Sequence, residues 1–279
     1  MKTFLVFADR TRRSVCDALE EALPHIRRHA RVEVIDLSTL HGEAAAAANL
    51  AIVFGGDGSI LRVARALGRN QIPTVGVNIG KLGFLAEISP RQLHEAIDAL
   101  AQGRFDVAKR MMIRCEALRD GNALTESLGL NDAVVSRGAF SRLISIGLFI
   151  DGEHVTDYNG DGLIVSTPVG STAHSLAAGG SILEANLEAF AVTPICPHTL
   201  SNRPLVMPST RTIELLIKPT DLPVALTIDG QVYVELKTGD RVIVRKADVE
   251  FRIIQAARHS YYETLREKLG WGGTVHGER

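Results

Sequence analysis

The stretch AIVFGGDGSILRVARALG, residues 51–68, decides how the first part of the chain folds. Its Asp57-Gly58 pair lies between two apolar runs, which is a strong short-range signal for a β-hairpin. The second run argues against a returning strand, because its apolar residues recur at the spacing of one helix face. These residues are Ile60, Val63, Ala64 and Leu67. The run before the glycines, residues 50–54, is apolar throughout, as in a strand covered on both sides. The stretch therefore predicts a strand, a glycine loop and a helix.

The same alternation of strands and helices extends over the first hundred residues. Strands are expected at residues 3–8, 31–35, 50–54 and 73–77. Helices are expected at residues 12–28, 59–67 and 90–100, the last with Ser89 as its N-cap and Pro90 at its first position. Alternation of this kind predicts an α/β domain built on a parallel sheet.

From about Asp106 the pattern changes to closely spaced strands separated by turn signals such as Asp151-Gly152. The expected strands are residues 144–150, 162–166, 213–217, 226–228, 232–236 and 241–245. This pattern is typical of an antiparallel, all-β sandwich-like domain. Residues 261–269 return to a helical pattern. We therefore expect an α/β domain at 1–105, a β-rich domain at 106–258, and a helical segment at 259–279 that packs on the first domain.

Composition and charge exclude several classes of protein. The 279 residues include 31 Lys plus Arg and 32 Asp plus Glu, and no basic stripe stands out, so we expect neither a nucleic-acid nor a membrane partner. Cys16, Cys115 and Cys196 match neither a disulfide framework nor a zinc pattern, which fits a reducing compartment. No run of residues approaches the roughly 20 apolar residues of a membrane helix. The expectation is a soluble protein of the cytoplasm.

The glycine loop carries one ionisable side chain, Asp57. Glycine loops before a helix let backbone N–H groups approach a phosphate, and a carboxylate there can accept a hydroxyl proton or hold Mg²⁺. The alternative is that Asp57 only caps the helix. The local sequence gives the two roles equal weight.

Two later stretches are weaker signals when each is taken alone. GVNIGKLGFLAE, residues 76–87, predicts a tight loop at the carboxyl edge of the sheet, where Phe84 either stacks on a flat ligand or, more often in such loops, packs in the core. Asn131 and Asp132 suit a base edge and a ribose hydroxyl, although a strand-entry turn explains them better on local grounds.

A fourth stretch, residues 159–180, is unusually rich in hydroxyl groups. The hydroxyl side chains are Ser166, Thr167, Ser171, Thr172 and Ser175. A helix cap needs one hydroxyl, so the excess favours a site for a polar ligand.

In this order along the chain, these stretches resemble the bacterial NAD kinases, which phosphorylate the 2′-hydroxyl of the adenosine ribose of NAD to make NADP. The resemblance covers nearly the whole chain. It rests on residues 55–58 (GGDG), 82–84 (LGF), 131–132 (ND), 160–162 (GDG), 170–173 (GSTA), 202–205 (NRPL), 229–231 (DGQ) and 265–271 (LREKLGW). It implies an α/β domain followed by a β-rich domain, with sites completed by a neighbouring subunit of a homodimer or homotetramer.

The resemblance also implies the site residues. Asp57 would be the catalytic base or electrostatic anchor at the 2′-hydroxyl, and no residue is assigned to a metal. The residues expected to bind nucleotide are Gly55, Gly56, Asp57, Gly58, Arg62, Phe84, Asn131, Asp132, Arg142, Asp161, Ser166, Thr172, Ala173, His174, Ala177 and Gln231. Phe84, Asn131 and Thr172 would surround the adenosine and Asp132 its ribose. Asp161 and Ala173 would approach the nicotinamide. ATP or another phosphoryl donor would act with Mg²⁺ or another divalent cation.

The chain departs from the family pattern at six positions, two of which, Ser181 and Ala185, stand where prolines are common. Ser59 and Asp132 keep the functional group of the usual Thr and Glu, whereas His174 replaces a Tyr and Ala177 a common Ser. Two other functions are alternatives: a lipid kinase of the diacylglycerol or sphingosine type, and a dinucleotide sensor without turnover. The 159–180 stretch speaks against the lipid kinases, and Asp57 in an intact loop speaks against the sensor.

Overall fold

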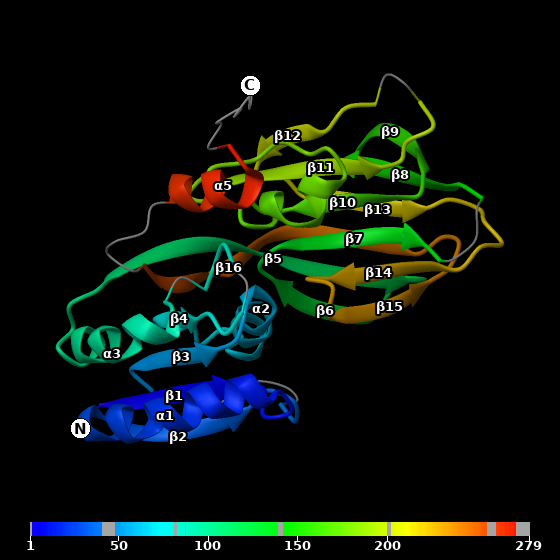
Figure 1. The fold of residues 1–279 in the computed structure, drawn as a ribbon. Helices are drawn as coiled ribbons and strands as arrows, with labels where there is room; N and C mark the ends of the chain where they lie inside the picture. Colours follow the sequence, from blue (N-terminus) through cyan, green and yellow to red (C-terminus); the bar gives the residue numbers. More distant parts are fainter. Residues whose placement is uncertain are drawn as a thin grey trace, which may run out of the picture. The chain divides into compact units, whose positions relative to one another are not determined.

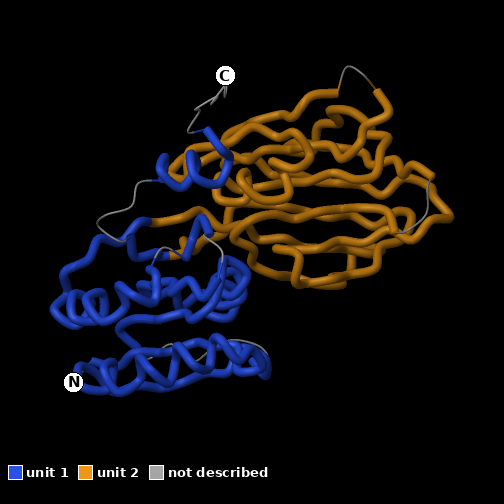
Figure 2. The backbone as a smooth tube through the Cα atoms, in the orientation of Figure 1, with its two compact units in different colours: residues 1–108, 252–279 blue, residues 109–251 orange. Residues whose placement is uncertain are grey.

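The computed structural model describes residues 2–40, 48–80, 83–86, 88–138, 142–199, 202–255 and 261–271. The chain forms two compact units, which Figure 2 distinguishes by colour. Unit 1 contains residues 1–108 and 252–279, and unit 2 contains residues 109–251. Unit 1 is therefore assembled from both ends of the chain, whereas unit 2 is continuous in sequence.

Unit 1 is the expected parallel α/β structure (Figure 1). Its strands lie in the order β2-β1-β3-β4, and Ile253 near the end of β16 pairs with Thr74 of β4. The strands are β1 (Thr3–Ala8), β2 (Arg31–Asp36), β3 (Leu50–Phe54), β4 (Thr74–Val77) and β16 (Arg241–Gln255). The helices are α1 (Arg13–His29), α2 (Asp57–Ala66), α3 (Leu93–Ala101) and α5 (Tyr261–Leu269), with the short 3₁₀ turn η1 (Pro90–Gln92) leading into α3.

Local sequence explains these elements. Every residue of β3 is buried, as its uninterrupted apolar run predicts, because β3 lies between β1 and β4 in the sheet. α1 buries Val15, Leu19, Ala22 and Ile26, which recur along one helix face. Ser89 caps η1 reciprocally with Gln92, and Pro90 is the first residue of η1, so this predicted helix start is confirmed.

Unit 2 is an antiparallel β-sandwich, which confirms the predicted class. One sheet has six strands in the order β12-β11-β10-β7-β14-β15. The other contains β16-β13-β8-β9, with β5 and β6 joined through β16. Its remaining strands are β5 (Asp106–Arg119), β6 (Asn122–Gly129), β7 (Asp132–Arg137), β8 (Ile144–Ile150), β9 (Glu153–Gly160), β10 (Gly162–Ser166), β11 (Ala189–Ile195), β12 (Leu205–Pro208), β13 (Ile213–Ile217), β14 (Val224–Ile228) and β15 (Val232–Leu236).

Three Asp-Gly pairs close hairpins in unit 2. Asp120, Asp151 and Asp229 have φ values of 50°, 51° and 52°, and the glycine after each also has a positive φ. Positive φ at both central residues is the type I′ turn, whose twist matches that of paired strands. Asp57-Gly58 is the same dipeptide but begins α2, so the choice of helix over hairpin at this position is confirmed.

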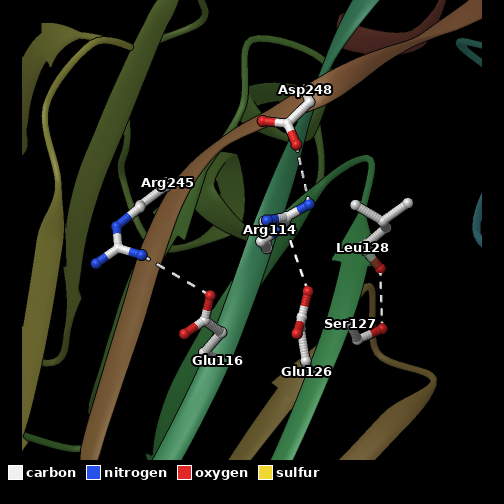
Figure 3. Close-up of polar contacts among 7 residues, drawn as sticks. All are labelled: Arg114, Glu116, Glu126, Ser127, Leu128, Arg245 and Asp248. Carbon is white, nitrogen blue, oxygen red and sulfur yellow. Dashed lines mark hydrogen bonds and ion pairs between the residues drawn. The ribbon is translucent and has the colours of Figure 1, made fainter. Parts of the chain in front are cut away.

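Strand β5 shows how the sandwich separates its core from a charged face. Met111, Ile113, Cys115 and Ala117 alternate into the hydrophobic core. On the other face of β5, Arg114 lies 3.1 Å from Asp248 and 3.4 Å from Glu126, as Figure 3 shows. Glu116 and Glu126 are direct partners across β5 and β6, where their like charges repel. The Arg114 guanidinium beside Glu126 offsets part of this repulsion.

Two short elements complete the fold near the middle of the chain: η2 (Gly170–Thr172) and α4 (His174–Ala177). They follow β10 directly. Among the residues that the structure describes, no helix is both long and apolar enough to cross a bilayer.

Candidate active site

The glycine loop holds Asp57 at the start of α2. Gly56 is the N-cap residue, and no side chain forms a capping hydrogen bond at this helix start. The alternative role for Asp57, a helix cap, is therefore wrong. Its carboxylate turns instead toward a loop 27 residues later in the chain. Phe84 N–H donates to Oδ2 at 2.7 Å, and the N–H groups of Leu85 and Ala86 donate to Oδ1 at 3.0 and 3.2 Å.

Gly83 explains why this loop can close on Asp57. A Cβ atom built on Gly83 would lie 2.0 Å from Oδ1 of Asp57, so a larger residue would displace the carboxylate. Gly56 shows the opposite environment, because a Cβ built there meets nothing within 4 Å. The backbone before α2 is thus open on the side where an anion could approach the helix start. Leu82, part of the predicted LGF motif, lies outside the described residues.

Arg62 and Phe84 are the other site residues predicted in unit 1. Arg62, half-buried on α2, donates from Nη2 to the carbonyl of Leu40 at 3.2 Å. The half-buried Phe84 ring has its centroid 6.4 Å from that of Tyr261, and Lys268 Nζ lies 4.4 Å above it. Phe84 therefore contacts α5 in unit 1.

In unit 2 the Asn131-Asp132 pair is held by Asp229. The Asp229 carboxylate accepts hydrogen bonds from the backbone N–H groups of Leu130, Asn131 and Asp132. The shortest of these bonds, to Asn131, is 2.7 Å. In return, Asp229 N–H donates to the Asp132 carbonyl at 3.0 Å. The Asp229-Gly230-Gln231 turn thus fixes the start of β7, a role that only the folded contact reveals.

Asn131 and Asp132 carry polar groups that the fold leaves available. Oδ1 of Asn131 is buried and has no hydrogen-bond partner among the described residues. Asp132 is 4 % exposed, and its burial, reinforced by the nearby Asp229 charge, raises the pKa of Asp132 to about 7. A buried amide oxygen without a partner and a carboxyl group poised between two protonation states are typical of ligand-binding positions.

The hydroxyl groups after β10 bond to groups of the protein itself. Thr167 donates to the Leu130 carbonyl at 2.6 Å, and Ser171 donates to the Pro168 carbonyl at 2.6 Å. Ser175 bonds Thr193 at 2.9 Å, and Thr172 donates to the Val169 carbonyl at 3.0 Å. Two of these hydroxyl groups bond within the turn and two tie it to Leu130 and Thr193, so each has a structural role and their number is not by itself evidence for a polar ligand.

This turn packs directly against Asn131. A Cβ on Gly170 would lie 2.0 Å from the Asn131 carbonyl oxygen, which leaves room for glycine alone. Ser166 pairs with Asp132 across β10 and β7, so the hydroxyl-rich turn and the Asn131-Asp132 pair share one end of the sheet.

The remaining predicted residues of unit 2 fall into two sets. Ala173, His174, Ala177, Gln231 and Arg142 are exposed to solvent. Asp161 is half-buried and lies before Gly162, at the end of β10 opposite to Ser166. About five residues of strand, on the order of 16 Å, separate it from the Asn131 end.

Asp161 forms an ion pair that the sequence did not suggest. Arg137 Nε lies 2.7 Å from Oδ1 of Asp161, and this hydrogen bond holds the pKa of Asp161 below its usual value. Sequence reasoning missed Arg137, although the antiparallel pairing of Gly162 with Ser136 brings it beside Asp161. Within the predicted set, the structure brings residues 55–58, 62 and 84 together in unit 1. In unit 2 it brings residues 131, 132, 166 and 172 together and sets Asp161 apart.

Comparison with known proteins gives a consistent result along the chain. Residues 4–105 match the model of the ATP-NAD kinase N-terminal domain, and residues 130–256 match that of the ATP-NAD kinase C-terminal domain. An NAD kinase of Rhodopirellula baltica is 41% identical over 262 residues, which cover 94% of this chain and 84% of the relative. An NAD kinase of Geobacter sulfurreducens is 44% identical over 225 residues, covering 81% and 79%.

Solved structures agree with the sequence matches. The yeast NADH kinase complexed with NADH superposes with a TM-score of 0.90 at 24% identity, covering 100% of this chain and 90% of the other. An NAD kinase from Archaeoglobus fulgidus in complex with ATP superposes with a TM-score of 0.78 at 26% identity, covering 98% and 100%. The first of these likenesses establishes the fold.

Proposed function

The chain belongs to the ATP-NAD kinase family and is a phosphotransferase, and from this premise we propose that Asp57 activates the 2′-hydroxyl of the adenosine ribose of NAD. The observation that carries the proposal is how Asp57 is held. An ionised carboxylate has about four acceptor positions, and backbone N–H groups occupy three of those on Asp57. The fourth, on Oδ2, is left to accept a hydrogen bond from a substrate hydroxyl.

The proposed reaction conserves atoms and charge. The 2′-oxygen of NAD attacks the γ-phosphorus of ATP, the bond from that phosphorus to the β,γ-bridging oxygen breaks, and ADP leaves. The hydroxyl proton passes to Oδ2 of Asp57 and then to solvent. Because three N–H groups fix the carboxylate plane, Oδ2 is positioned before substrate binds.

The glycine loop would bind the phosphates. Its backbone before α2 is open at Gly56, and the positive end of a helix favours an anion there. Arg62 lies one turn further along α2 and would add a charged donor. A divalent cation would bind through the phosphates of ATP and neutralise charge on them.

Unit 2 would supply the contacts to adenosine. Oδ1 of Asn131 could accept a hydrogen bond from the exocyclic amino group of adenine, which would give this buried oxygen its missing partner. Asp132, with a pKa of about 7, could either donate to or accept from a ribose hydroxyl. These assignments rest on the family resemblance, on the unsatisfied amide oxygen of Asn131 and on the buried carboxyl group of Asp132.

We propose further that a second copy of the chain completes the site. Asp161 lies at the end of β10 opposite to Ser166, so it is remote from the Asn131 end of its own sheet. A neighbouring subunit could present Asp161 to the nicotinamide half of NAD, which Ala173, next to Thr172, would also approach. We place this oligomer in the cytoplasm, where the free thiols of Cys16, Cys115 and Cys196 would stay reduced.

The decisive experiment is a coupled assay. The purified chain is mixed with NAD, Mg²⁺ and either ATP or polyphosphate, and NADP is detected with an NADP-specific dehydrogenase. Product formed with ATP supports the proposal, and parallel reactions with NADH as acceptor define the acceptor preference. Thermal stabilisation by NAD without any product would instead identify a dinucleotide sensor.

A further inference from the structure

A cluster of histidines joins α1 to α3 in unit 1. His25 and His29 project from α1, and His94 and Asp98 project from α3. Nε2 of His25 lies 2.7 Å from Oδ1 of Asp98, and Nε2 of His29 lies 2.9 Å from the same oxygen. The His94 ring stacks on His25 with 4.5 Å between ring centroids.

This cluster is remote from the glycine loop. α1 ends at His29, and Arg31 N–H then donates to the Lys2 carbonyl just before β1 begins. Lys2 Nζ in turn donates to the Ala101 carbonyl at the end of α3. The cluster therefore lies toward the amino edge of the parallel sheet, whereas Gly55 follows the carboxyl end of β3. The assignments of the active site do not involve it.

The spacing of these residues is that of metal ligands. Two histidines four residues apart on one helix face are the arrangement by which zinc-binding helices present two imidazoles. Here a carboxylate from a second helix lies opposite, and the three donor atoms of His25, His29 and Asp98 lie within 4.8 Å of one another. An imidazole, an imidazole and a carboxylate form a common ligand set for zinc and its neighbours among the divalent transition metals.

The surroundings also favour a cation. His29 is the last residue of α1, where the helix dipole places partial negative charge. The side chain of His25 is 14% exposed, while those of His29 and Asp98 are 31% and 42% exposed, so an ion could enter from solvent. The neighbouring charges on these helices are Glu21, Arg27 and Arg28 on α1 and Glu95 on α3.

We propose that His25, His29 and Asp98 bind a divalent transition-metal ion of the zinc class. Zinc bonds of about 2.0–2.2 Å in tetrahedral geometry require donor atoms roughly 3.3 Å apart. The distances of 2.7 and 2.9 Å from the two imidazole nitrogens to Oδ1 of Asp98 would increase by a few tenths of an ångström when the ion takes the place of the hydrogen-bonding protons. Three protein ligands leave a fourth position for water or for His94. The bound ion would pin the last turns of α1 to α3.

The test uses the full-length chain, stripped of metal by a chelator and free of nucleotide. Zinc binding is measured by competition with a chromophoric chelator, and Co²⁺ is added separately to record the visible bands of a tetrahedral site. The variants are His25→Gln/His29→Gln and Asp98→Asn. The matched control is His154→Gln, because His154 also contacts an aspartate, Asp157 at 2.9 Å, but with a single imidazole.

We expect wild type and His154→Gln each to bind one equivalent of zinc at this site. The double variant should bind that equivalent on the order of 100-fold more weakly, and Asp98→Asn at least about 10-fold more weakly. Saturating zinc should raise the melting temperature of wild type by on the order of 5 °C and leave that of the double variant unchanged. A cooperative thermal unfolding transition in the presence of the chelator shows that each metal-free variant is folded.

Two results would overturn the proposal. One is the absence of saturable zinc binding to wild type. The other is equal zinc affinity and the same Co²⁺ spectrum in wild type and in the double variant, which would place the ion elsewhere. Neither result bears on NADP formation, so the proposed function is tested independently.

Discussion

At the scale of single residues, three aspartates of this chain show how its surroundings set what a carboxyl group does. Asp57 and Asp229 each accept three backbone N–H groups from a segment distant in sequence, and so each fixes a loop. Asp132, beside Asp229, is buried with a raised pKa. The same side chain thus acts as a fixed acceptor at two positions and as a titrating group at the third, because its surroundings differ.

Replacing Asp57 by Asn should reduce kcat by roughly 10²–10⁴-fold with little change in NAD affinity, because the amide cannot accept the hydroxyl proton. The amide also presents an N–H₂ group to a backbone donor of residues 84–86, so the NAD titration separates any effect on this loop from the loss of the proton acceptor. Gly83→Ala is the matched variant, since it crowds the carboxylate but retains it. Steady-state kinetics and NAD titrations compare the two. Activity of Asp57→Asn within about threefold of wild type would exclude the proton-accepting role.

Asp132 predicts a pH dependence of stability. Its pKa of about 7 in the folded chain exceeds that of an unfolded aspartate, so between about pH 4 and 7 the folded state binds a proton that the unfolded state lacks. The free energy of unfolding therefore falls as pH rises through this window, by up to about 1.4 kcal/mol per pH unit. The Asp132→Asn variant lacks this titrating group and so does not lose stability in this way. The free energy of unfolding of the variant minus that of wild type should therefore increase from pH 5 to pH 8.

Urea denaturation at several pH values measures that difference. Asp221→Asn, which removes an exposed carboxylate of the same unit, is the control for the change in net charge. A stability difference between Asp132→Asn and wild type that stays constant from pH 5 to pH 8 would contradict the raised pKa.

At the scale of elements, local sequence predicts those whose apolar residues follow a regular period. β1, β3, β8, β10, β13, β15 and α5 have the predicted bounds, and the other predicted elements of unit 1 differ by one or two residues at their ends. β14 begins two residues before its predicted start, and β16 ends ten residues after its predicted end. Six strands of the β-rich region were not predicted: β5, β6, β7, β9, β11 and β12. β6, β9 and β12 carry many exposed polar residues and owe their pairing to neighbouring strands, whereas β7 and β11 are largely buried and lack the polar–apolar alternation of a half-buried strand.

The candidate site divides in the same way. Gly55 and Gly56 were placed correctly between β3 and α2, since strand, loop and helix each have a local signal, whereas Asp57 and Gly58 form the start of α2, two residues before its predicted beginning. The bonds from Asp57 to residues 84–86, from Asp229 to residues 130–132 and from Arg137 to Asp161 were not predicted. They join residues 24 or more positions apart, and only the folded chain brings these groups together.

Helix α5 should be a stabilising element of unit 1. Thr264 and Leu265 are buried, and Tyr261 and Lys268 contact Phe84 of the loop that holds Asp57. Leu265→Ala should lower the free energy of unfolding by roughly 2–5 kcal/mol, as for other buried leucines. Removal of residues 261–279 should lower the melting temperature further, because it exposes the apolar surface that α5 covers.

Thermal and urea unfolding measure both effects. Glu267→Ala, at an exposed position of the same helix, is the matched control and should change stability by no more than about 0.5 kcal/mol. Equal melting temperatures for the truncated and full-length chains would show that α5 contributes nothing to unit 1.

At the scale of the whole molecule, the chain combines two cores of different construction. Unit 1 buries a parallel sheet under helices, and unit 2 buries the inner faces of two antiparallel sheets. Parallel sheets present loops and helix starts at their carboxyl edges, which suits phosphate binding at Gly55–Gly58. The sandwich presents a strand end with the unsatisfied amide oxygen of Asn131 and the buried carboxyl group of Asp132, which suits recognition of a base and a sugar.

The interrupted sequence of unit 1 has a consequence for the order in which the protein can fold during synthesis. Its core includes Ile254, and its sheet is extended at β4 by Ile253, yet both residues emerge from the ribosome about 150 positions after the rest of the unit. A nascent chain that ends before residue 253 can contain all of unit 2 but lacks part of the unit 1 core. The sandwich can therefore finish folding first, and the unit that carries the glycine loop becomes complete only after residues 253 and 254 have been synthesised.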